Sequence, residues 1–294
     1  MKQLLILSGK GGTGKTTLAS AFIELSEAKA YADCDVDAPN LHLIMNIKSQ
    51  PESKDYFGLG KAVINQDLCI SCGLCYEHCK FDTINETDGV YEVFSYACEG
   101  CGVCEYICPV EAVKLYPDVA GELYLYKEKG KVFSTAKLKM GSGTSGKLVT
   151  EVKKQMRLAA PDEKFAIIDG SPGIGCPVIA SISGVSMVLI VTEPSVSGIS
   201  DMERILQTAA AFQTKTAVCI NKSDTNTGKT KEIEEYCRKN NIEMVGKIPF
   251  DPVAVETINA GKTLANVDCP SSRAIGATYQ NTMKLFLGNG ESSK

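Results

Sequence analysis

Short apolar runs alternate with amphipathic stretches along most of the chain. Four of the runs are almost continuously hydrophobic, at 3–8, 165–171, 187–194 and 216–222. Runs of this kind are typical of strands buried on both faces, as in parallel sheets covered by helices. Helical patterns separate them, at 16–28, 199–212 and 229–240. The alternation predicts an α/β fold with a doubly wound, mostly parallel sheet.

One segment interrupts this alternation. Residues 61–116 are rich in turns, punctuated by cysteines and internally repeated. We therefore predict a small α+β domain at 61–116, inserted into an α/β domain made of residues 1–60 and 117–294. After the insert, residues 121–138 have the pattern of a small meander with a turn at Lys129-Gly130.

The chain has 13 cysteines, and eight of them form two matching runs within the insert. The runs are Cys69-x2-Cys72-x2-Cys75-x3-Cys79 and Cys98-x2-Cys101-x2-Cys104-x3-Cys108-Pro109. This is the bacterial ferredoxin pattern, in which the fourth cysteine of each run ligates the other cluster. It predicts two [4Fe–4S] clusters, one held by Cys69, Cys72, Cys75 and Cys108 and one by Cys98, Cys101, Cys104 and Cys79. A zinc site, the alternative, would instead use paired C-x2-C knuckles.

The first apolar run leads into a glycine-rich loop and then a helical pattern. Residues 9–16, GKGGTGKT, fit G-x-x-x-x-G-K-[ST] in the strand–loop–helix context that this motif requires. We expect the loop backbone to surround the phosphates of ATP or ADP, Lys15 to reach the β and γ phosphates, and Thr16 to bind Mg²⁺. A chance glycine turn is the alternative. The residues expected to bind nucleotide here are Gly9, Gly11, Gly12, Thr13, Gly14, Lys15, Thr16 and Thr17.

The loop has a second lysine, Lys10, which lies away from the phosphates that Lys15 would contact. KGGTGKTT resembles the deviant phosphate loop of the MinD/ParA/nitrogenase iron protein class of dimeric ATPases. The resemblance implies that Lys10 crosses a dimer interface to reach the ATP of a partner subunit, in a homodimer or a heterodimer with a related ATPase. A solvated lysine at the tip of a loop is the alternative.

The resemblance extends to four further regions. YADCDVDAPNLHL (31–43) resembles the first switch of the class, which implies that Asp35 orients the attacking water and that Asp33 and Asp37 lie near the metal. IIDGSPGIGC (167–176) resembles the second switch, with Asp169 as the Mg²⁺-linked carboxylate. Asn221 resembles the asparagine that reads adenine, and 248–262 the segment that flanks the base, with Pro249 and Asp251.

Taken together, these motifs resemble MinD-superfamily ATPases with an inserted ferredoxin domain. The leading hypothesis is an ATPase that couples nucleotide state to electron transfer or metallocluster handling, with a redox or metallocluster protein as partner. Cys176, on the second switch, either binds a cluster bridging two subunits or is a packed thiol. The alternatives are an assembly scaffold or carrier of the Mrp type and a MinD/ParA-like positioning ATPase. Cys34, Cys219, Cys237 and Cys269 are expected to be structural.

Charge and hydropathy argue against two classes of partner. The formal net charge of −4 gives no electrostatic footprint for nucleic acid. No apolar run approaches the roughly 18 residues of a membrane span, and the N-terminal residues do not have the pattern of a signal peptide. Residues 279–294 have only a short apolar patch, which argues against a membrane-binding terminal helix. We expect a cytoplasmic protein without stable membrane insertion.

Overall fold

The computed structural model describes residues 1–288 and divides the chain into two compact units. The first unit contains residues 1–52, 124–136 and the chain from 146 onward. The second contains residues 53–123 and 137–145. The predicted insert, 61–116, falls within the second unit.

The main sheet has nine strands, in the order β13-β12-β11-β1-β10-β2-β9-β8-β3. All neighbouring strands from β13 to β9 pair in parallel, so the predicted mostly parallel α/β sheet is confirmed. The central strands are buried on both faces, as their continuous hydrophobicity indicates. The strands are β1 (Lys2–Leu7), β2 (Ala30–Asp33), β3 (Glu52–Phe57), β8 (Val119–Glu128), β9 (Lys131–Leu138), β10 (Phe165–Asp169), β11 (Met187–Thr192), β12 (Lys215–Asn221) and β13 (Glu243–Ile248).

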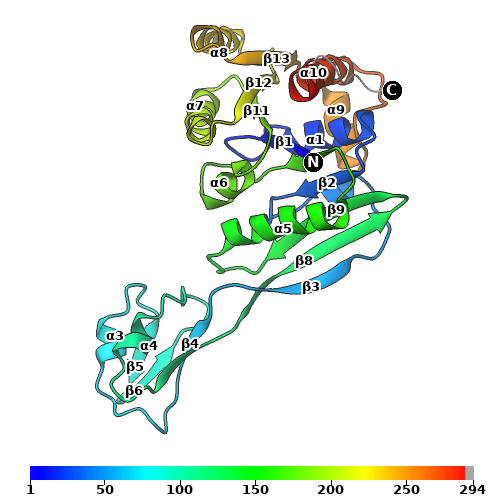
Figure 1. Ribbon diagram of the computed structural model, residues 1–294. Coiled ribbons are helices and arrows are strands. Elements are labelled where there is room, and N and C mark those ends of the chain that lie inside the picture. Colours follow the sequence, from blue (N-terminus) through cyan, green and yellow to red (C-terminus); the bar gives the residue numbers. More distant parts are fainter. Residues whose placement is uncertain (289–294) are drawn as a thin grey trace. The chain divides into compact units, whose positions relative to one another are not determined.

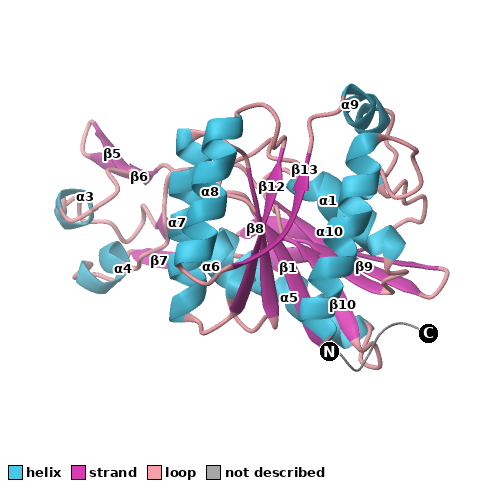
Figure 2. Cartoon of the chain, turned by 90° about the horizontal axis from the view of Figure 1, so that it is seen from above, coloured by secondary structure: helices cyan, strands magenta, loops and turns pink. Residues whose placement is uncertain are grey.

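Helices cover both faces of this sheet (Figure 2). The face that carries Leu4, Ile6 and Leu189 packs against α1 (Lys15–Leu25) and α10 (Pro270–Leu287). The opposite face is covered by α5 (Ser145–Ala159), α6 (Cys176–Ile182), α7 (Val196–Ala211) and α8 (Thr227–Lys239). Two short helices, α2 (Leu41–Ile44) and α9 (Pro252–Asn259), complete the first unit. No helix within residues 1–288 is long and apolar enough to cross a membrane, and 289–294 lie outside the described residues.

The segment predicted as a small meander is a hairpin that belongs to the main sheet. Strands β8 and β9 are connected by Lys129 and Gly130, whose φ angles of 52° and 75° are those of a tight hairpin turn. Strand β9 then pairs in parallel with β2, with Ala30 opposite Val132. The hairpin could be read from its turn residues, whereas the pairing with β2 is a long-range contact that the local pattern does not encode.

Besides most of β3 and the adjoining ends of β8 and β9, the second unit contains two antiparallel strand pairs and two short helices (Figure 1). Strand β4 (Lys61–Ile64) pairs with β7 (Val113–Tyr116), and β5 (Ile84–Thr87) with β6 (Val90–Val93). Helices α3 (Leu74–Glu77) and α4 (Val103–Ile107) each lie within one cysteine run. The buried core of this unit is small, consisting of Ala62, Ile64, Cys75, Ile84, Cys98 and Val113.

Candidate nucleotide site and cysteine sites

The glycine-rich loop lies between the carboxyl end of β1 and the first residue of α1. Gly12 and Gly14 have φ angles of 78° and 88°, in the left-handed region that glycine adopts without strain. A Cβ on Gly14 would lie 2.3 Å from Nδ2 of Asn221. Asn221 Nδ2 also donates a hydrogen bond of 2.7 Å to the carbonyl oxygen of Thr13. The asparagine predicted to read a base therefore braces the loop from the end of β12.

Three charged side chains meet at the carboxyl ends of β1, β10 and β2. Lys15 Nζ lies 2.6 Å from Oδ1 of Asp169, and both side chains are almost completely buried. Burial lowers the pKa of Lys15, but the charges of Asp169, Asp33 and Asp35 outweigh it, so the net pKa is raised. The lysine therefore stays protonated in the absence of nucleotide.

Asp33 is fully buried and held by the backbone of the loop that follows it. Its Oδ1 accepts a hydrogen bond from the N–H of Asp35, and its Oδ2 accepts from those of Asn40 and Leu41, all at 3.0 Å. Burial and the charge of Asp169 raise the pKa of Asp33 to about 7. Burial also raises the pKa of Asp35, whereas Asp37 is exposed.

The fit of this site to Mg²⁺ can be judged from the oxygens that it presents. Oδ2 of Asp169 is buried and has no hydrogen-bond partner among the described residues. Hard cations take oxygen ligands, and an unpartnered buried carboxylate oxygen is suited to that role. Thr16 follows Lys15 in the first turn of α1, and its Oγ1 lies 3.4 Å from Lys15 Nζ. Asp169 and Thr16 are thus residues that could hold the ion.

Lys10 lies apart from Lys15 and contacts a different carboxylate. Its Nζ is 3.3 Å from Oε2 of Glu193, just after β11, and 3.5 Å from Oγ of Ser197. Lys222 Nζ binds the other oxygen of Glu193 and donates to the carbonyl of Gly12 at 3.1 Å. Sequence reasoning missed Glu193 and Lys222, although both follow buried strands and Lys222 directly follows Asn221.

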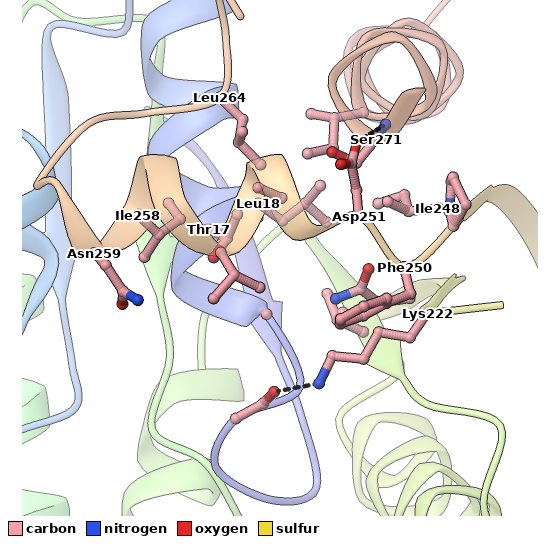
Figure 3. Close-up of a pocket in the computed structure, with 18 residues that line it drawn as sticks. Thr17, Leu18, Lys222, Ile248, Phe250, Asp251, Ile258, Asn259, Leu264 and Ser271 are labelled. Atoms are coloured by element: carbon pink, nitrogen blue, oxygen red, sulfur yellow. Dashed lines mark hydrogen bonds between the residues drawn. The ribbon is translucent and has the colours of Figure 1, made fainter. Parts of the chain in front are cut away.

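A cavity of about 210 Å³ opens beside the loop (Figure 3). Gly12, Gly14 and Thr17 line one side, and Asn221 and Pro249 line another. The rest of the lining is mainly apolar and includes Leu18, Phe250, Ala254, Ile258 and Ile275. A mostly apolar cavity with a few polar groups, adjoining a phosphate-type loop, has the character of a site for a planar base.

Asp251 lines this cavity but uses its carboxylate within the fold. Its Oδ1 accepts from the N–H of Val253, which caps α9, and its Oδ2 accepts from the N–H of Ser271 at the start of α10. The hydrogen bond from Ser271 is the main cause of its lowered pKa. Asp251 therefore fixes the two helices that form one wall of the cavity (Figure 3).

The eight cysteines of the second unit gather around two small hollows. One hollow is lined by Cys69, Cys72, Cys75 and Cys108, and the other by Cys79, Cys98, Cys101 and Cys104. Each hollow thus combines three cysteines of one run with the last cysteine of the other. The remaining lining is almost entirely apolar, and each hollow has a volume of about 20 Å³.

The cysteines around the two hollows differ in how readily they ionise, since burial raises the pKa values of Cys75 and Cys104. Burial alone would raise the pKa values of Cys79 and Cys108, but hydrogen bonds from the chain lower them overall. Among the described residues, no three cysteine, histidine or acidic side chains converge closely enough to hold a single metal ion. Thiolates around a four-iron cubane bind separate corners, and four cysteines around each hollow are a donor set of that kind.

The other cysteines differ in exposure. Cys176 is exposed and is the first residue of α6, whereas Cys34, Cys219, Cys237 and Cys269 are buried. At the far end of α6, the buried Nζ of Lys153 donates to the carbonyls of Ala180, Ser181 and Ser183 at 2.6–3.2 Å. This lysine of α5, which sequence reasoning missed, satisfies the carbonyl groups at the end of the helix that Cys176 begins.

Comparison with known proteins places the first unit in a described family. The model of the CobQ/CobB/MinD/ParA nucleotide binding domain matches residues 4–264. Uncharacterized protein MJ0578 of Methanocaldococcus jannaschii is 32% identical over 228 residues, which are 76% of this chain and 79% of that protein. MinD of Pyrococcus horikoshii, solved with Mg-ADP, has the same fold, with a TM-score of 0.56 and 16% identity over 97% of this chain and 96% of that one. The resemblance seen in the phosphate loop and switches is thereby confirmed at the level of the family.

A further match to a known protein covers a much smaller share of the chain. A ferredoxin of Saccharopolyspora erythraea is 38% identical over 52 residues, which are 18% of this chain and 49% of that protein. A match of this length is comparable to the predicted insert of residues 61–116.

Proposed function

The chain belongs to the CobQ/CobB/MinD/ParA nucleotide-binding domain family, and from this premise we propose that it is a dimeric ATPase carrying two [4Fe–4S] clusters. In this proposal, the nucleotide state of the first unit is coupled to electron transfer through the second. The observation that carries it is that one chain combines a phosphate-loop lysine paired to a buried carboxylate with two hollows of four cysteines each.

The nucleotide part of the proposal assigns roles to residues of the first unit. The N–H groups of the loop and the N-terminus of α1 face the phosphates, where the helix dipole favours negative charge. Lys15 exchanges its contact with Asp169 for the phosphates, which leaves Asp169 and Thr16 to hold Mg²⁺. Asp35 orients the attacking water, and the base lies in the cavity between Asn221 and Pro249.

Dimerisation is proposed from Lys10, which lies on the far side of the loop from Lys15. In the isolated chain Glu193 and Ser197 hold this lysine. A cation held by a partly exposed carboxylate can leave it at small cost, because exposed ion pairs contribute only about 0–1 kcal/mol. Lys10 can therefore reach across to the nucleotide of a partner subunit, where it would stabilise charge in the transition state.

The iron–sulfur part of the proposal rests on the donor set of the second unit. When bound, the clusters supply one-electron redox chemistry. The eight cysteine thiolates hold them, the apolar lining limits access of water, and backbone N–H groups donate to the sulfurs. A small core of this size also needs metal ligation for stability, which explains why so few apolar residues suffice here.

A carrier or scaffold of the Mrp type is the second candidate, and the exposure of Cys176 favours it. An accessible thiol at the start of a helix is suited to binding a labile cluster. In that case the protein would transfer a cluster to an apo-protein, whereas an electron-transfer ATPase would not.

Anaerobic iron and sulfide analysis, combined with nucleotide binding, tests the proposed function. We expect about eight irons and eight sulfides per chain, since two clusters of four irons follow from the ligand rule. A Cys72→Ser, Cys101→Ser double variant should lose most of the iron yet still bind ATP, because the first unit has its own core. Zinc in place of iron, or a single cluster in the parent protein, would overturn the proposal.

A further inference from the structure

The two cysteine hollows are bordered by the same loop, built twice. Cys79 and Cys108 each accept a hydrogen bond on Sγ from the N–H of the fourth residue that follows, at 3.4 and 3.2 Å. The third residue after each cysteine has a positive φ, 50° at Asp82 and 52° at Glu111. A strand begins at the fifth residue in both cases. The chain thus provides its own comparison between the two sites.

One position breaks the equivalence of the two loops. The fourth residue is Thr83 after Cys79 but Ala112 after Cys108, and both are buried. Oγ1 of Thr83 lies 3.4 Å from Sγ of Cys79, in addition to the backbone hydrogen bond. A cysteine that ligates iron is a thiolate and has no proton, so the threonine hydroxyl must be the donor. The Cys79 sulfur therefore receives a side-chain hydrogen bond that Cys108 cannot receive from Ala112.

A positive charge lies beside the same hollow. The Nζ of Lys61 donates to the carbonyl oxygen of Cys98, which is one of the cysteines that line it. Asp82 and Glu111 occupy equivalent positions in the two loops, but Glu111 is paired with Lys114 at 3.4 Å, so the charges around the two hollows do not by themselves decide between them. Glu99 also lines this hollow and is only half-exposed, so its charge opposes that of Lys61, and the hydroxyl of Thr83 at the sulfur itself carries the inference.

Hydrogen bonds and nearby positive charge both favour the reduced state of a cluster. Reduction adds negative charge that spreads over the sulfurs, and a donor to sulfur stabilises that charge more in the reduced state than in the oxidised one. In a buried, apolar setting the effect is screened little by water. The hydroxyl of Thr83 and the ammonium of Lys61 therefore both act to raise the reduction potential of the cluster.

We propose that Thr83 sets the reduction potential of the cluster bound by Cys79, Cys98, Cys101 and Cys104, and that this cluster has the higher potential of the two. An electron entering the second unit would then come to rest on this cluster rather than on the one bound by Cys69, Cys72, Cys75 and Cys108. The inference rests on the proposed function, since it requires that both clusters bind.

The test is an anaerobic redox titration of the full chain, followed by electron paramagnetic resonance with dithionite as reductant. Thr83→Val removes the hydroxyl at nearly constant volume, and Thr83→Ser keeps it. Ala112→Ser places a hydroxyl at the equivalent position of the other loop. Iron content is measured on every variant, so that potentials are compared only between fully loaded proteins.

We expect Thr83→Val to lower the higher midpoint by about 40–60 mV, which is a five- to tenfold change at 59 mV per tenfold for one electron. Thr83→Ser should keep the parent midpoint to within a small fraction of that shift. Ala112→Ser should raise the lower midpoint and leave the higher one unchanged. Because the two substitutions act on different midpoints, they also assign each midpoint to its cysteine set.

Different outcomes overturn different statements. A parent protein without two clusters would overturn the proposed function and this inference with it. Two clusters whose midpoints are unchanged by Thr83→Val would overturn the inference alone. The same holds if Thr83→Val moves the lower midpoint, or if Thr83→Ser shifts the potential as much as valine does.

Discussion

At the scale of single residues, the nucleotide site is a buried group of charges that do not balance. Lys15 is shared between Asp169, which it contacts at 2.6 Å, and Asp33, whose charge also acts on it. One lysine cannot neutralise two buried carboxylates. The imbalance acts mainly on Asp33. Burial and the charge of Asp169 together raise its pKa to about 7. Near neutral pH this site gains stability from any added cation that lies close to the carboxylates.

The raised pKa of Asp33 predicts a pH-dependent stability. The folded state binds a proton at Asp33 more tightly than the unfolded state, so the free energy of unfolding should fall as pH rises from about 4 to about 7. Asp33→Asn resembles the protonated acid and should flatten this part of the profile. The measurement is denaturant unfolding of the nucleotide-free protein between pH 4.5 and 8.

Asp37→Asn is the matched control, since Asp37 is an exposed carboxylate of the same loop. For Asp37→Asn, the free energy of unfolding should change with pH in parallel with that of the parent protein. If Asp33→Asn also runs parallel to the parent, Asp33 is ionised throughout the range and the buried charges are balanced in some other way.

The two loop lysines predict separable losses of function. Lys15→Ala should abolish nucleotide binding, because its buried ammonium is the cation directed at the phosphates. Lys10→Ala should keep binding but lose ATP-dependent dimerisation and most hydrolysis, since the ammonium of Lys10 contacts Glu193 and Ser197 rather than the phosphate side of the loop within residues 1–288. Nucleotide titration, sedimentation and phosphate release distinguish the two. Hydrolysis by Lys10→Ala at the parent rate would refute its role across the dimer.

At the scale of elements, helix α5 contacts both ends of helix α6. Gly146 on α5 lies so close to Cys176 that a Cβ would meet its carbonyl oxygen at 3.1 Å. Lys153, two turns further along α5, binds three carbonyls around the other end of α6. Since the segment between Asp169 and Cys176 connects β10 to α6, the position of α5 affects the residues that follow Asp169.

Removing the ammonium of Lys153 should destabilise the first unit. Lys153→Met keeps the apolar stem but leaves buried carbonyls without their donor, at a cost of roughly 2 kcal/mol. Lys154→Met is the control, because Lys154 is exposed and forms a surface ion pair with Glu151, so its loss should cost under about 0.5 kcal/mol. Urea denaturation gives both values. Equal stabilities of the two variants would show that the carbonyls find other partners.

The elements that could be predicted from the sequence are those whose signal is local. Continuous hydrophobicity predicts the buried strands, the glycines predict the loop at 9–16, and Lys-Gly predicts the turn at 129–130. The contacts made by Glu193, Lys153 and Thr83 could not be predicted in the same way. Glu193 and Lys153 contact segments that are distant in the sequence, and the contact of Thr83 depends on the direction of its side chain. The residue types alone do not specify these partners.

At the scale of the whole molecule, the chain passes between its two units four times, after residues 52, 123, 136 and 145. Two of these passages lie within β8 and β9, so they are hydrogen-bonded strands rather than free linkers. The last one leads directly into α5, which begins at Ser145. Through Gly146 and Lys153 this helix contacts the segment that starts with Cys176. A nucleotide-dependent movement of that segment can therefore reach the second unit through short, ordered connections.

This connectivity predicts that nucleotide state and cluster potential are coupled. A ligand shifts such an equilibrium only by its difference in affinity for the two states, and coupling between sites is typically about 1–3 kcal/mol. For a one-electron couple this corresponds to about 40–130 mV, at 59 mV per tenfold. Binding energies are reciprocal, so reduction should change ATP affinity by the same factor. Potentiometric titrations of the loaded protein with ATP, with ADP and without nucleotide measure the shift, and Lys15→Ala supplies a control whose midpoints should not respond. Identical midpoints in all three states would mean that the two units are tethered without being coupled, and would favour the cluster-carrier function over electron transfer.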